Sequence, residues 1–211
     1  MEGAAFSPDF RPARPEDASL AAELIALSDG ELGLALFGLG DLAMERRILA
    51  GLYQRKGNRY SYELGEIAEA GGQAAGLLLA VPGAAIPRLN LSMAGQLWRL
   101  FGLRRWLEFC RRAVTLAGFK EVVPGELMVG NLAVLPQFRG RGIARQLLAR
   151  AEALASRLGL ARLTLTVDLG NPRARRIYTS TGYRVDLTYR TGRQQPLLHT
   201  AGFERMVKEV I

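Results

Sequence analysis

Residues 126–158 form the stretch that most restricts what this chain can fold into. Residues 126–135 are mostly apolar and are bounded on both sides by proline-containing turns, which is typical of a buried β-strand. Apolar residues then recur every three or four positions over 143–158, which predicts one buried face of a helix. The stretch therefore predicts a strand, a short loop that contains Gly140 and Gly142, and a helix.

This loop has the features of an anion-binding site. A helix N-terminus presents backbone N–H groups that have no partner inside the helix, and the aligned peptide dipoles add a partial positive charge there. Gly140 and Gly142 lack the Cβ atoms that would keep a phosphate away from those amides. Full positive charges come from Arg139, Arg141 and Arg145. Two glycines spaced by one residue also occur in ordinary turns, so the loop alone leaves that alternative open.

Two better-known phosphate loops are excluded by their spacing. A Walker A loop needs Gly, four residues and then Gly-Lys-Ser/Thr, and the chain contains no such string. A dinucleotide-binding fingerprint needs a further glycine at the position that Arg145 holds.

A second block of defined spacing covers residues 161–183. Apolar and polar side chains alternate over 161–168, which predicts a half-buried strand. A short helix is expected next, because Asn171 suits the N-cap, Pro172 the first helical position and Gly182 the left-handed residue after the end.

Together the two blocks resemble the GNAT superfamily of N-acyltransferases, whose bacterial-type members acetylate small molecules or proteins. The string Gln137-x-x-Gly140-x-Gly142 resembles its acyl-CoA-binding motif. The second motif is similar to Asn171-x-x-Ala174-x-x-x-Tyr178-x-x-x-Gly182-Tyr183. The resemblance implies a single α/β (α+β) domain over 1–211, with a mixed, mostly antiparallel sheet of about seven strands flanked by helices.

The composition agrees with a folded protein of this size. The chain has 211 residues, of which 49% are hydrophobic, so it can bury a substantial core. No stretch reaches the roughly 18 apolar residues of a membrane span and the N-terminus lacks the apolar core of a signal peptide, so we expect a cytoplasmic protein. Cys110 is the only cysteine, which excludes an intrachain disulfide and a cysteine-based zinc site, and we expect no metal. Because His199, the only histidine, is far away in sequence, a catalytic thiol is not favoured.

The formal charge of +8 indicates a polyanionic partner or a basic surface. Coenzyme A is polyanionic, and six arginines lie near the two motifs, namely Arg139, Arg141, Arg145, Arg173, Arg175 and Arg176. A nucleic acid is not expected, because the chain offers no recognition motif and no strand with interleaved basic and stacking aromatic residues.

The N-terminal half is expected to supply the rest of the sheet and the acceptor side of the site. We expect, in order, a strand within 6–15, a helix from Leu20 to about Ser28 capped by Asp17 or Ser19, a glycine-rich linker over 29–40, a helix over 41–53, and strands over 60–70 and 73–81 joined at Gly71-Gly72. The linker is either a packed apolar loop or a mobile lid. Two further strands are expected at the C-terminus, over 184–191 and 200–208, joined by the polar segment 192–198.

Residues 83–125 are expected to be a helical insertion between the third and fourth strands, with two helical pieces separated near Gly102. The second piece is amphipathic. Its apolar side holds Leu103, Trp106, Leu107, Phe109, Cys110, Ala113, Val114 and Ala117, and its polar side holds Arg104, Arg105, Glu108, Arg111 and Arg112. The commoner use of such a helix is to pack on its own domain. An anionic membrane, a partner, the acceptor pocket or a homodimer contact remain alternatives.

The resemblance also implies the roles of particular residues. Backbone amides of the strand before the loop would contact the pantetheine and thioester of acetyl-CoA, and the loop would bind its pyrophosphate. The residues that this assigns to the cosubstrate are Leu132, Ala133, Val134, Leu135, Gln137, Arg139, Gly140, Arg141, Gly142, Ile143, Ala144, Asn171 and Ala174.

Tyr178 would be the general acid that protonates the coenzyme thiolate. The alternative is a core tyrosine on a short helix. Glu126, which lies 11 residues before Gln137, would deprotonate the amine through water, or would simply start the strand. Asn131, at a nearer position that is often acidic in the family, would hold only a water molecule.

The sequence thus predicts an N-acetyltransferase that moves an acetyl group from acetyl-CoA to a primary amine by direct attack. The alternative is a non-catalytic acyl-CoA-binding sensor or partner-binding domain. Antibiotics, polyamines, amino acids and protein N-termini all remain candidate acceptors.

Overall fold

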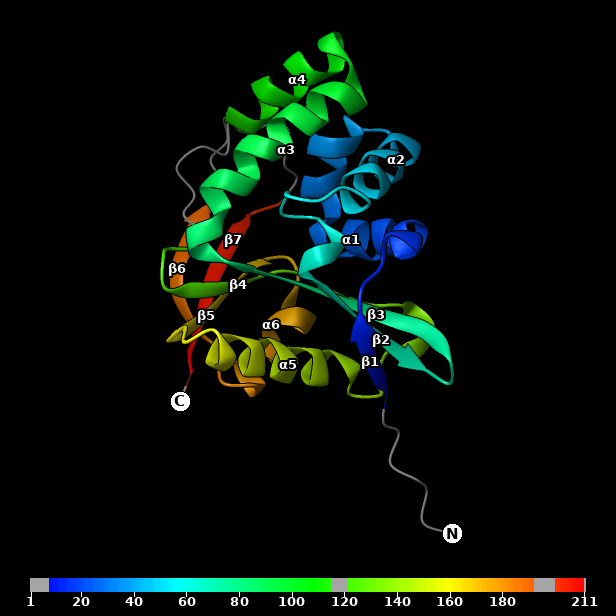
Figure 1. Ribbon diagram of the computed structural model, residues 1–211. Helices are drawn as coiled ribbons and strands as arrows, with labels where there is room; N and C mark the ends of the chain where they lie inside the picture. The colour runs from blue at the N-terminus through cyan, green and yellow to red at the C-terminus, as the bar shows by residue number, and fades with distance from the viewer. Residues whose placement is uncertain (1–7, 115–120, 192–199, 211) are drawn as a thin grey trace.

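A mixed sheet of seven strands organises the described part of the molecule (Figure 1). The computed structural model describes residues 8–114, 121–191 and 200–210. The strands are β1 (Asp9–Pro12), β2 (Gly65–Ala70), β3 (Gln73–Pro82), β4 (Glu126–Val134), β5 (Arg162–Asp168), β6 (Arg184–Arg190) and β7 (Gly202–Glu209). Their order across the sheet is β1-β2-β3-β4-β5-β7-β6, and only the β4–β5 pair is parallel. This confirms the predicted fold class.

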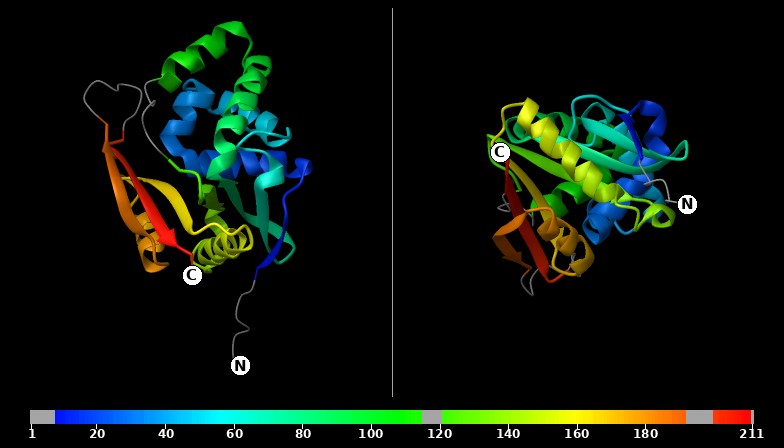
Figure 2. Two further views of the ribbon diagram at one scale, coloured as in Figure 1. Left: turned by 60° about the vertical axis from the view of Figure 1, so that its left-hand side comes forward. Right: turned by 90° about the horizontal axis from the view of Figure 1, so that it is seen from below.

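Helices cover both faces of the sheet. They are α1 (Ala18–Gly33), α2 (Leu42–Tyr53), α3 (Ile86–Phe101), α4 (Leu103–Val114), α5 (Ile143–Arg157) and α6 (Pro172–Ser180). The first four lie above the sheet in Figure 1, whereas α5 and α6 lie below it, as the side view and the view from below in Figure 2 also show. Apolar residues of α1, α2, α5 and the central strands form one main core.

Several predicted elements are confirmed with small shifts at their ends. The β2–β3 hairpin turns at Gly71 and Gly72, both of which have positive φ (60° and 75°), the conformation that makes glycine favourable in a two-residue turn. Helix α5 starts at Ile143, as its apolar spacing predicts, and buries Leu147 and Leu148 against the sheet. Residues 192–198, the predicted connection between the last two strands, lie outside the described residues.

The sheet opens between β4 and β5. These parallel strands pair only over 126–129 and 162–165. At the next position Gly130 forms a β-bulge, because it has no partner on β3 while its neighbours pair with Leu79 and Ala80. A bulge bends its strand, so β4 turns away from β5 here and leaves a gap between their C-terminal ends.

The segment over 29–40 differs from the predicted glycine-rich loop. Helix α1 continues through a kink at Gly30 (φ 57°), and a π-helical turn, η2 (Leu34–Gly38), follows it. Tertiary packing outweighs the low helix propensity of the glycines. Phe37 is buried, with its ring 5.2 Å from that of Tyr60 and 5.9 Å from that of Phe109.

The prediction of a side-chain cap for α1 is wrong. Asp17 occupies the N-cap position but makes no capping hydrogen bond to α1. Its carboxylate instead accepts from the backbone N–H of Arg14 at 2.8 Å and forms an ion pair with Arg11 at 2.7 Å. The stronger charge-assisted contact with Arg11 holds the carboxylate away from the helix.

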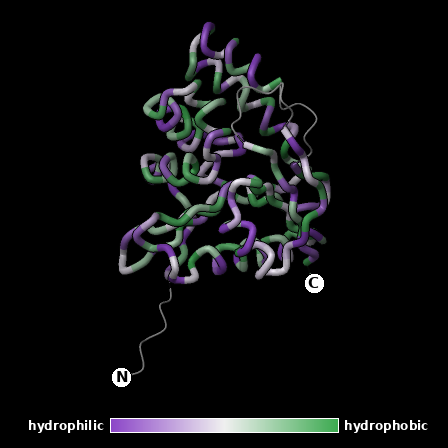
Figure 3. Tube along the Cα trace, turned by 180° about the vertical axis from the view of Figure 1, so that it is seen from behind, coloured by the Kyte–Doolittle hydropathy of each residue, from purple (hydrophilic) through white to green (hydrophobic). Residues whose placement is uncertain are grey.

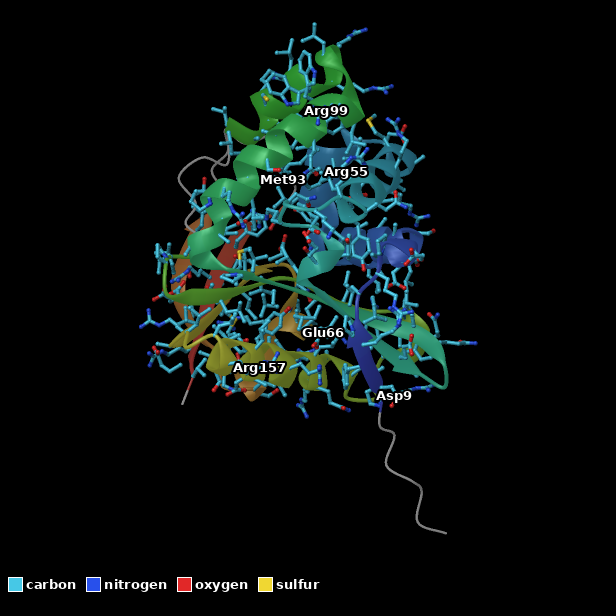
Figure 4. All side chains as sticks on the ribbon, in the orientation of Figure 1. Asp9, Arg55, Glu66, Met93, Arg99 and Arg157 are labelled. Atoms are coloured by element: carbon cyan, nitrogen blue, oxygen red, sulfur yellow. The ribbon has the colours of Figure 1, made fainter. Side chains whose placement is uncertain are left out.

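Helices α3 and α4 form the predicted insertion: in Figure 1, α3 runs upward beside α2 and α4 lies at the top. They separate at Gly102, as expected, where φ is 71°. Part of the apolar side of α4 packs on its own domain: Phe109 lies 5.8 Å from Phe101 between ring centres. Leu103 and Leu107 remain exposed, and the tube in Figure 3 alternates between polar and apolar colours along this hairpin. Figure 4 shows Arg99 at its outer end.

Within the described ranges, no helix has the length and apolar character that crossing a membrane requires.

Candidate active site

A cavity of about 1140 Å³ lies on the β4 side of the gap in the sheet and extends between α5 and α6. This volume is larger than the roughly 300–1,000 Å³ of most small-molecule pockets, so it suits a long ligand. The cavity is lined by Leu27, Leu132, Ala133, Val134, Phe138, Arg139, Gly140, Gly142, Ile143, Ala144, Arg145, Asn171, Pro172, Arg173, Ala174, Arg175, Arg176, Ile177, Tyr178, Thr179 and Ser180.

The edge of β4 presents backbone N–H groups to this gap. The N–H of Leu132 donates to the Ser28 hydroxyl at 3.3 Å, so it points away from β3. Successive N–H groups of a strand point to opposite edges, and the N–H of Val134, two residues on, faces the gap as well. The N–H of Leu135 donates to the carbonyl of Ala75 on β3 at 2.8 Å. The Leu135 N–H therefore faces β3 and not the gap, which does not support the predicted contact of this amide with the cosubstrate.

The glycine loop lies at the start of α5, as the sequence predicts. Gly140 and Gly142 have φ of 82° and 79°, which non-glycine residues rarely adopt. A Cβ atom at either position would meet no atom within 4 Å, so the glycines serve backbone conformation and openness rather than close packing. Gly142 is the N-cap of α5 and makes no side-chain cap. The first-turn amides of Ile143 and Ala144 are therefore available to a ligand, and both residues line the cavity.

Besides Leu135, two residues predicted to contact the cosubstrate, Gln137 and Arg141, are not among those that line the cavity. Gln137 is exposed on the short helical turn Pro136–Phe138. The guanidinium of Arg141 lies over the Phe138 ring, 5.5 Å from its centre.

Five arginines give the cavity a strongly positive wall, and they are Arg139, Arg145, Arg173, Arg175 and Arg176. Arg145 donates to the Ser180 hydroxyl at 3.2 Å and so joins α5 to α6 across the cavity. Arg175 forms an ion pair with Glu204 of β7 at 2.6 Å. Guanidinium groups and helix N-terminal amides are the donors that phosphates prefer, so the chemistry of this wall fits a diphosphate. The sequence located these arginines near the motifs but did not assign Arg173, Arg175 and Arg176 to the site.

Tyr178 lines the same cavity from α6. The helix starts where predicted, because Asn171 accepts the N–H of Ala174 at 3.0 Å. The Tyr178 side chain is half-buried, and burial raises the pKa of its phenol to about 12. The phenol is therefore protonated at neutral pH and can donate a proton but not accept one. The ring of Tyr183, 6.0 Å away, packs beside it.

Glu126 lies in a different environment. It is at the N-terminal end of β4 and is 2% exposed, and it is not among the residues that line the cavity. Its carboxylate forms ion pairs with Arg205 and with Arg162, and it accepts the backbone N–H of Val123 at 3.1 Å. These contacts do not support the predicted base, because the carboxylate is already enclosed by positive partners.

Sequence reasoning also missed residues that have no motif. Leu27 of α1 reaches the cavity together with Phe138, Ile177, Thr179 and Ser180. Ile177, Thr179 and Ser180 could have been predicted, because they are next to Tyr178 on one short helix. Leu27 gave none. The described ranges contain no group of three or more His, Cys, Asp or Glu side chains that could hold a metal ion.

Comparisons with known proteins point to one family. The model of the acetyltransferase (GNAT) family matches residues 100–183, which contain the glycine loop and α6. An uncharacterized N-acetyltransferase of Mycobacterium bovis is 31% identical over 108 residues, which cover 49% of this chain and 69% of that protein. A chloroplastic GCN5-related N-acetyltransferase of Arabidopsis thaliana is 42% identical over 60 residues, but the match spans only 21% of that protein.

Solved structures share the fold. An N-acetyltransferase from Staphylococcus aureus Mu50 superposes with a TM-score of 0.69 at 22% identity, over 94% of this chain and 99% of that one. Another acetyltransferase gives a TM-score of 0.66 at 23% identity, over 96% and 100% of the two chains. The family model, the opened sheet and the Mycobacterium bovis relative all indicate the same family. The chain therefore belongs to the GNAT family of N-acetyltransferases.

Proposed function

We propose that this protein transfers an acetyl group from acetyl-CoA to a primary amine by direct attack, and that Tyr178 is the general acid. We also propose that residues 1–211 form one N-acyltransferase domain, which the single sheet shared by all described strands supports. The observation that carries the proposal is the position of the Tyr178 phenol in the same cavity as the glycine loop and the arginine wall.

The residues that would hold the cosubstrate divide by chemistry. The first-turn amides of α5 and the side chains of Arg139 and Arg145 would bind the pyrophosphate. The amides of Leu132 and Val134 would bind the pantetheine arm and the thioester oxygen. The hydroxyl oxygen of Ser28 already accepts from the Leu132 N–H, which supports an oxygen-binding role for this amide.

The phenol acts on the departing sulfur. A phenol whose pKa is about 12 gives its proton to a thiolate, whose acid has a pKa of roughly 8.5, only against the equilibrium. Tyr178 therefore contributes by position, since the proton transfer accompanies carbon–sulfur cleavage and formation of the stable amide makes the whole reaction favourable.

The test is release of free thiol from acetyl-CoA across a panel of amines, peptides and aminoglycosides. Tyr178→Phe should lower kcat by about 100-fold with the best acceptor while acetyl-CoA affinity, measured by calorimetry, stays unchanged. Tyr183→Phe is the matched control: its ring packs beside Tyr178, but Tyr183 is not among the cavity-lining residues. It should keep wild-type kcat.

Equal activity of wild type and Tyr178→Phe would remove the general-acid role. Acetyl-CoA binding without thiol release for any acceptor would favour the acyl-CoA sensor instead.

A further inference from the structure

We propose that Asp29 of α1 is the general base that takes a proton from the acceptor amine, and that Asn131 of β4 positions it. The inference rests on the proposed acetyl transfer. It concerns the side of β4 that faces α1, where sequence analysis assigns no role to a carboxylate.

Three consecutive residues of α1 connect the cavity to this carboxylate. Leu27 lines the cavity, the Ser28 hydroxyl accepts from the Leu132 N–H at 3.3 Å, and Asp29 accepts from the Asn131 side-chain amide at 2.6 Å. Asn131 directly precedes Leu132 on β4. Asp29 therefore lies next to the end of the cavity at which the thioester would bind.

The backbone explains why this part of α1 ends at β4. Regular helical geometry breaks at Gly30, which has φ of 57° and ψ of −137° and directly follows Asp29. The first segment of α1 therefore presents Ser28 and Asp29 at its C-terminal end instead of burying them in a continuous helix. Asp29 stays half-buried, so an acceptor can reach it.

The groups around Asp29 both hold it and set its proton affinity. Arg59 and the Asn131 amide favour the ionised form of Asp29 and so lower its pKa. Glu121, which pairs with Arg59 at 2.8 Å, disfavours the ionised form and raises the pKa. The Tyr60 hydroxyl donates to the second carboxylate oxygen at 3.4 Å. Burial outweighs these contacts and raises the pKa of Asp29 to about 7.

Glu45 of α2 adds a second carboxylate close by. Gly33 lies between the two side chains. A Cβ atom added to Gly33 would be 2.7 Å from Oε1 of Glu45 and 2.7 Å from Cβ of Asp29, so the two acidic side chains are near each other. Glu45 is 2% exposed, and Oε1 has no hydrogen-bond partner among the described residues. An unpartnered buried carboxylate beside Asp29 favours a cationic ligand in this region, as an ammonium group would be.

The proton and bond changes balance without another reactant. The acceptor arrives as an ammonium ion, and one of its protons passes to a carboxylate oxygen of Asp29. The freed electron pair forms the nitrogen–carbon bond, and the carbon–sulfur bond breaks with its electrons on sulfur. The thiolate takes the Tyr178 proton, and the phenolate recovers one from the product nitrogen. Asp29 then releases its proton to water.

The experiment measures kcat/KM against pH for wild type, Asp29→Asn and Glu31→Gln, with the best acceptor found in the panel. Glu31 is an exposed carboxylate two residues further along the same helix, so it is the matched control. Wild type should lose activity below about pH 7, where Asp29 becomes protonated. Asp29→Asn should be about 100-fold slower near pH 7, with unchanged acetyl-CoA affinity, and should recover as pH rises and the amine loses its proton in solution. Glu31→Gln should match wild type.

Asn131→Ala supplies an independent test that keeps the carboxylate. The Asn131 hydrogen bond favours the ionised form of Asp29, so its loss should move the acidic limb of the profile to higher pH. A purely structural contact would lower activity equally at all pH values.

The outcomes separate this inference from the proposed function. Activity that falls in Tyr178→Phe but not in Asp29→Asn overturns the inference alone. The same holds if Asp29→Asn loses activity equally across the pH range, or if Asn131→Ala leaves the limb in place. If wild type releases no thiol with any acceptor, both proposals fail.

Discussion

Glu126 allows a direct choice between a structural and a catalytic role. Glu126 and Arg205 have side chains that are 3% and 8% exposed, so Glu126→Ala leaves Arg205 buried without its main partner. Removal of one member of a buried ion pair typically costs about 3–5 kcal/mol of unfolding free energy. Arg205 keeps its contact with Asp186, and Arg162 keeps Glu209, so we expect the lower end, about 3 kcal/mol.

The assay is thermal unfolding followed by activity on the folded protein. For a chain of about 200 residues each kcal/mol shifts Tm by about 2–4 °C, so Glu126→Ala should lower Tm by about 6–12 °C. Glu209→Ala removes exposed ion pairs with Arg162 and Arg184, and should cost at most about 1 kcal/mol. Below both transitions, Glu126→Ala should keep wild-type kcat. A variant with unchanged Tm and a kcat about 100-fold lower would refute this reasoning and restore Glu126 as the base.

Two further predictions concern the glycine loop and the acidic residue beside Asp29. Gly142→Ala should cost about 1–2 kcal/mol through its left-handed backbone and also weaken acetyl-CoA binding in calorimetry, whereas Gly159→Ala, with φ of 64° at the far end of α5, should cost a similar amount and leave affinity unchanged. Equal affinities for the two variants would contradict a role of the loop in binding. Burial and then the charge of Asp29 raise the pKa of Glu45 to about 7, so folding takes up a proton and the stability of wild type falls as pH rises through about 7. Glu45→Gln should make this decline smaller in melting temperatures measured from about pH 5 to pH 9, because the raised pKa of Asp29 contributes the rest, and an unchanged decline would contradict the assignment.

The cosubstrate side of the site was predictable because it depends on the backbone of contiguous residues. Left-handed φ at Gly140 and Gly142 requires residues without a Cβ, and an N-cap at Asn171 requires a short polar side chain. Such requirements leave a local pattern in the sequence. The predicted contact residues that do not line the cavity are Leu135, Gln137 and Arg141, and their assignment depended instead on which way a group points.

The acceptor side left no such pattern. Asp29 and Asn131 are 102 residues apart in the chain, and their contact depends on the kink at Gly30 and on the bulge at Gly130. Glycine in an otherwise helical or extended stretch predicts an interruption, but not its direction. The sequence therefore predicts a loop around Gly30, whereas packing of the adjacent turn, Leu34–Gly38, keeps the segment helical.

The proposed cosubstrate site and the proposed acceptor site depend on different parts of the chain. In the proposed function, the loop at Gly140 and Gly142 would bind a cosubstrate that is the same for every acceptor, and its geometry tolerates few residue types. Asp29 and Glu45 belong to α1 and α2, and neither residue itself has a left-handed backbone. Side chains there can change without altering the left-handed backbone of the loop, and the hydrogen bonds of Ser28 and Asp29 with β4 connect the two regions. Selection among amines can therefore act on α1 and α2 while cosubstrate binding stays constant, and the pair of carboxylates favours an acceptor that arrives as a cation.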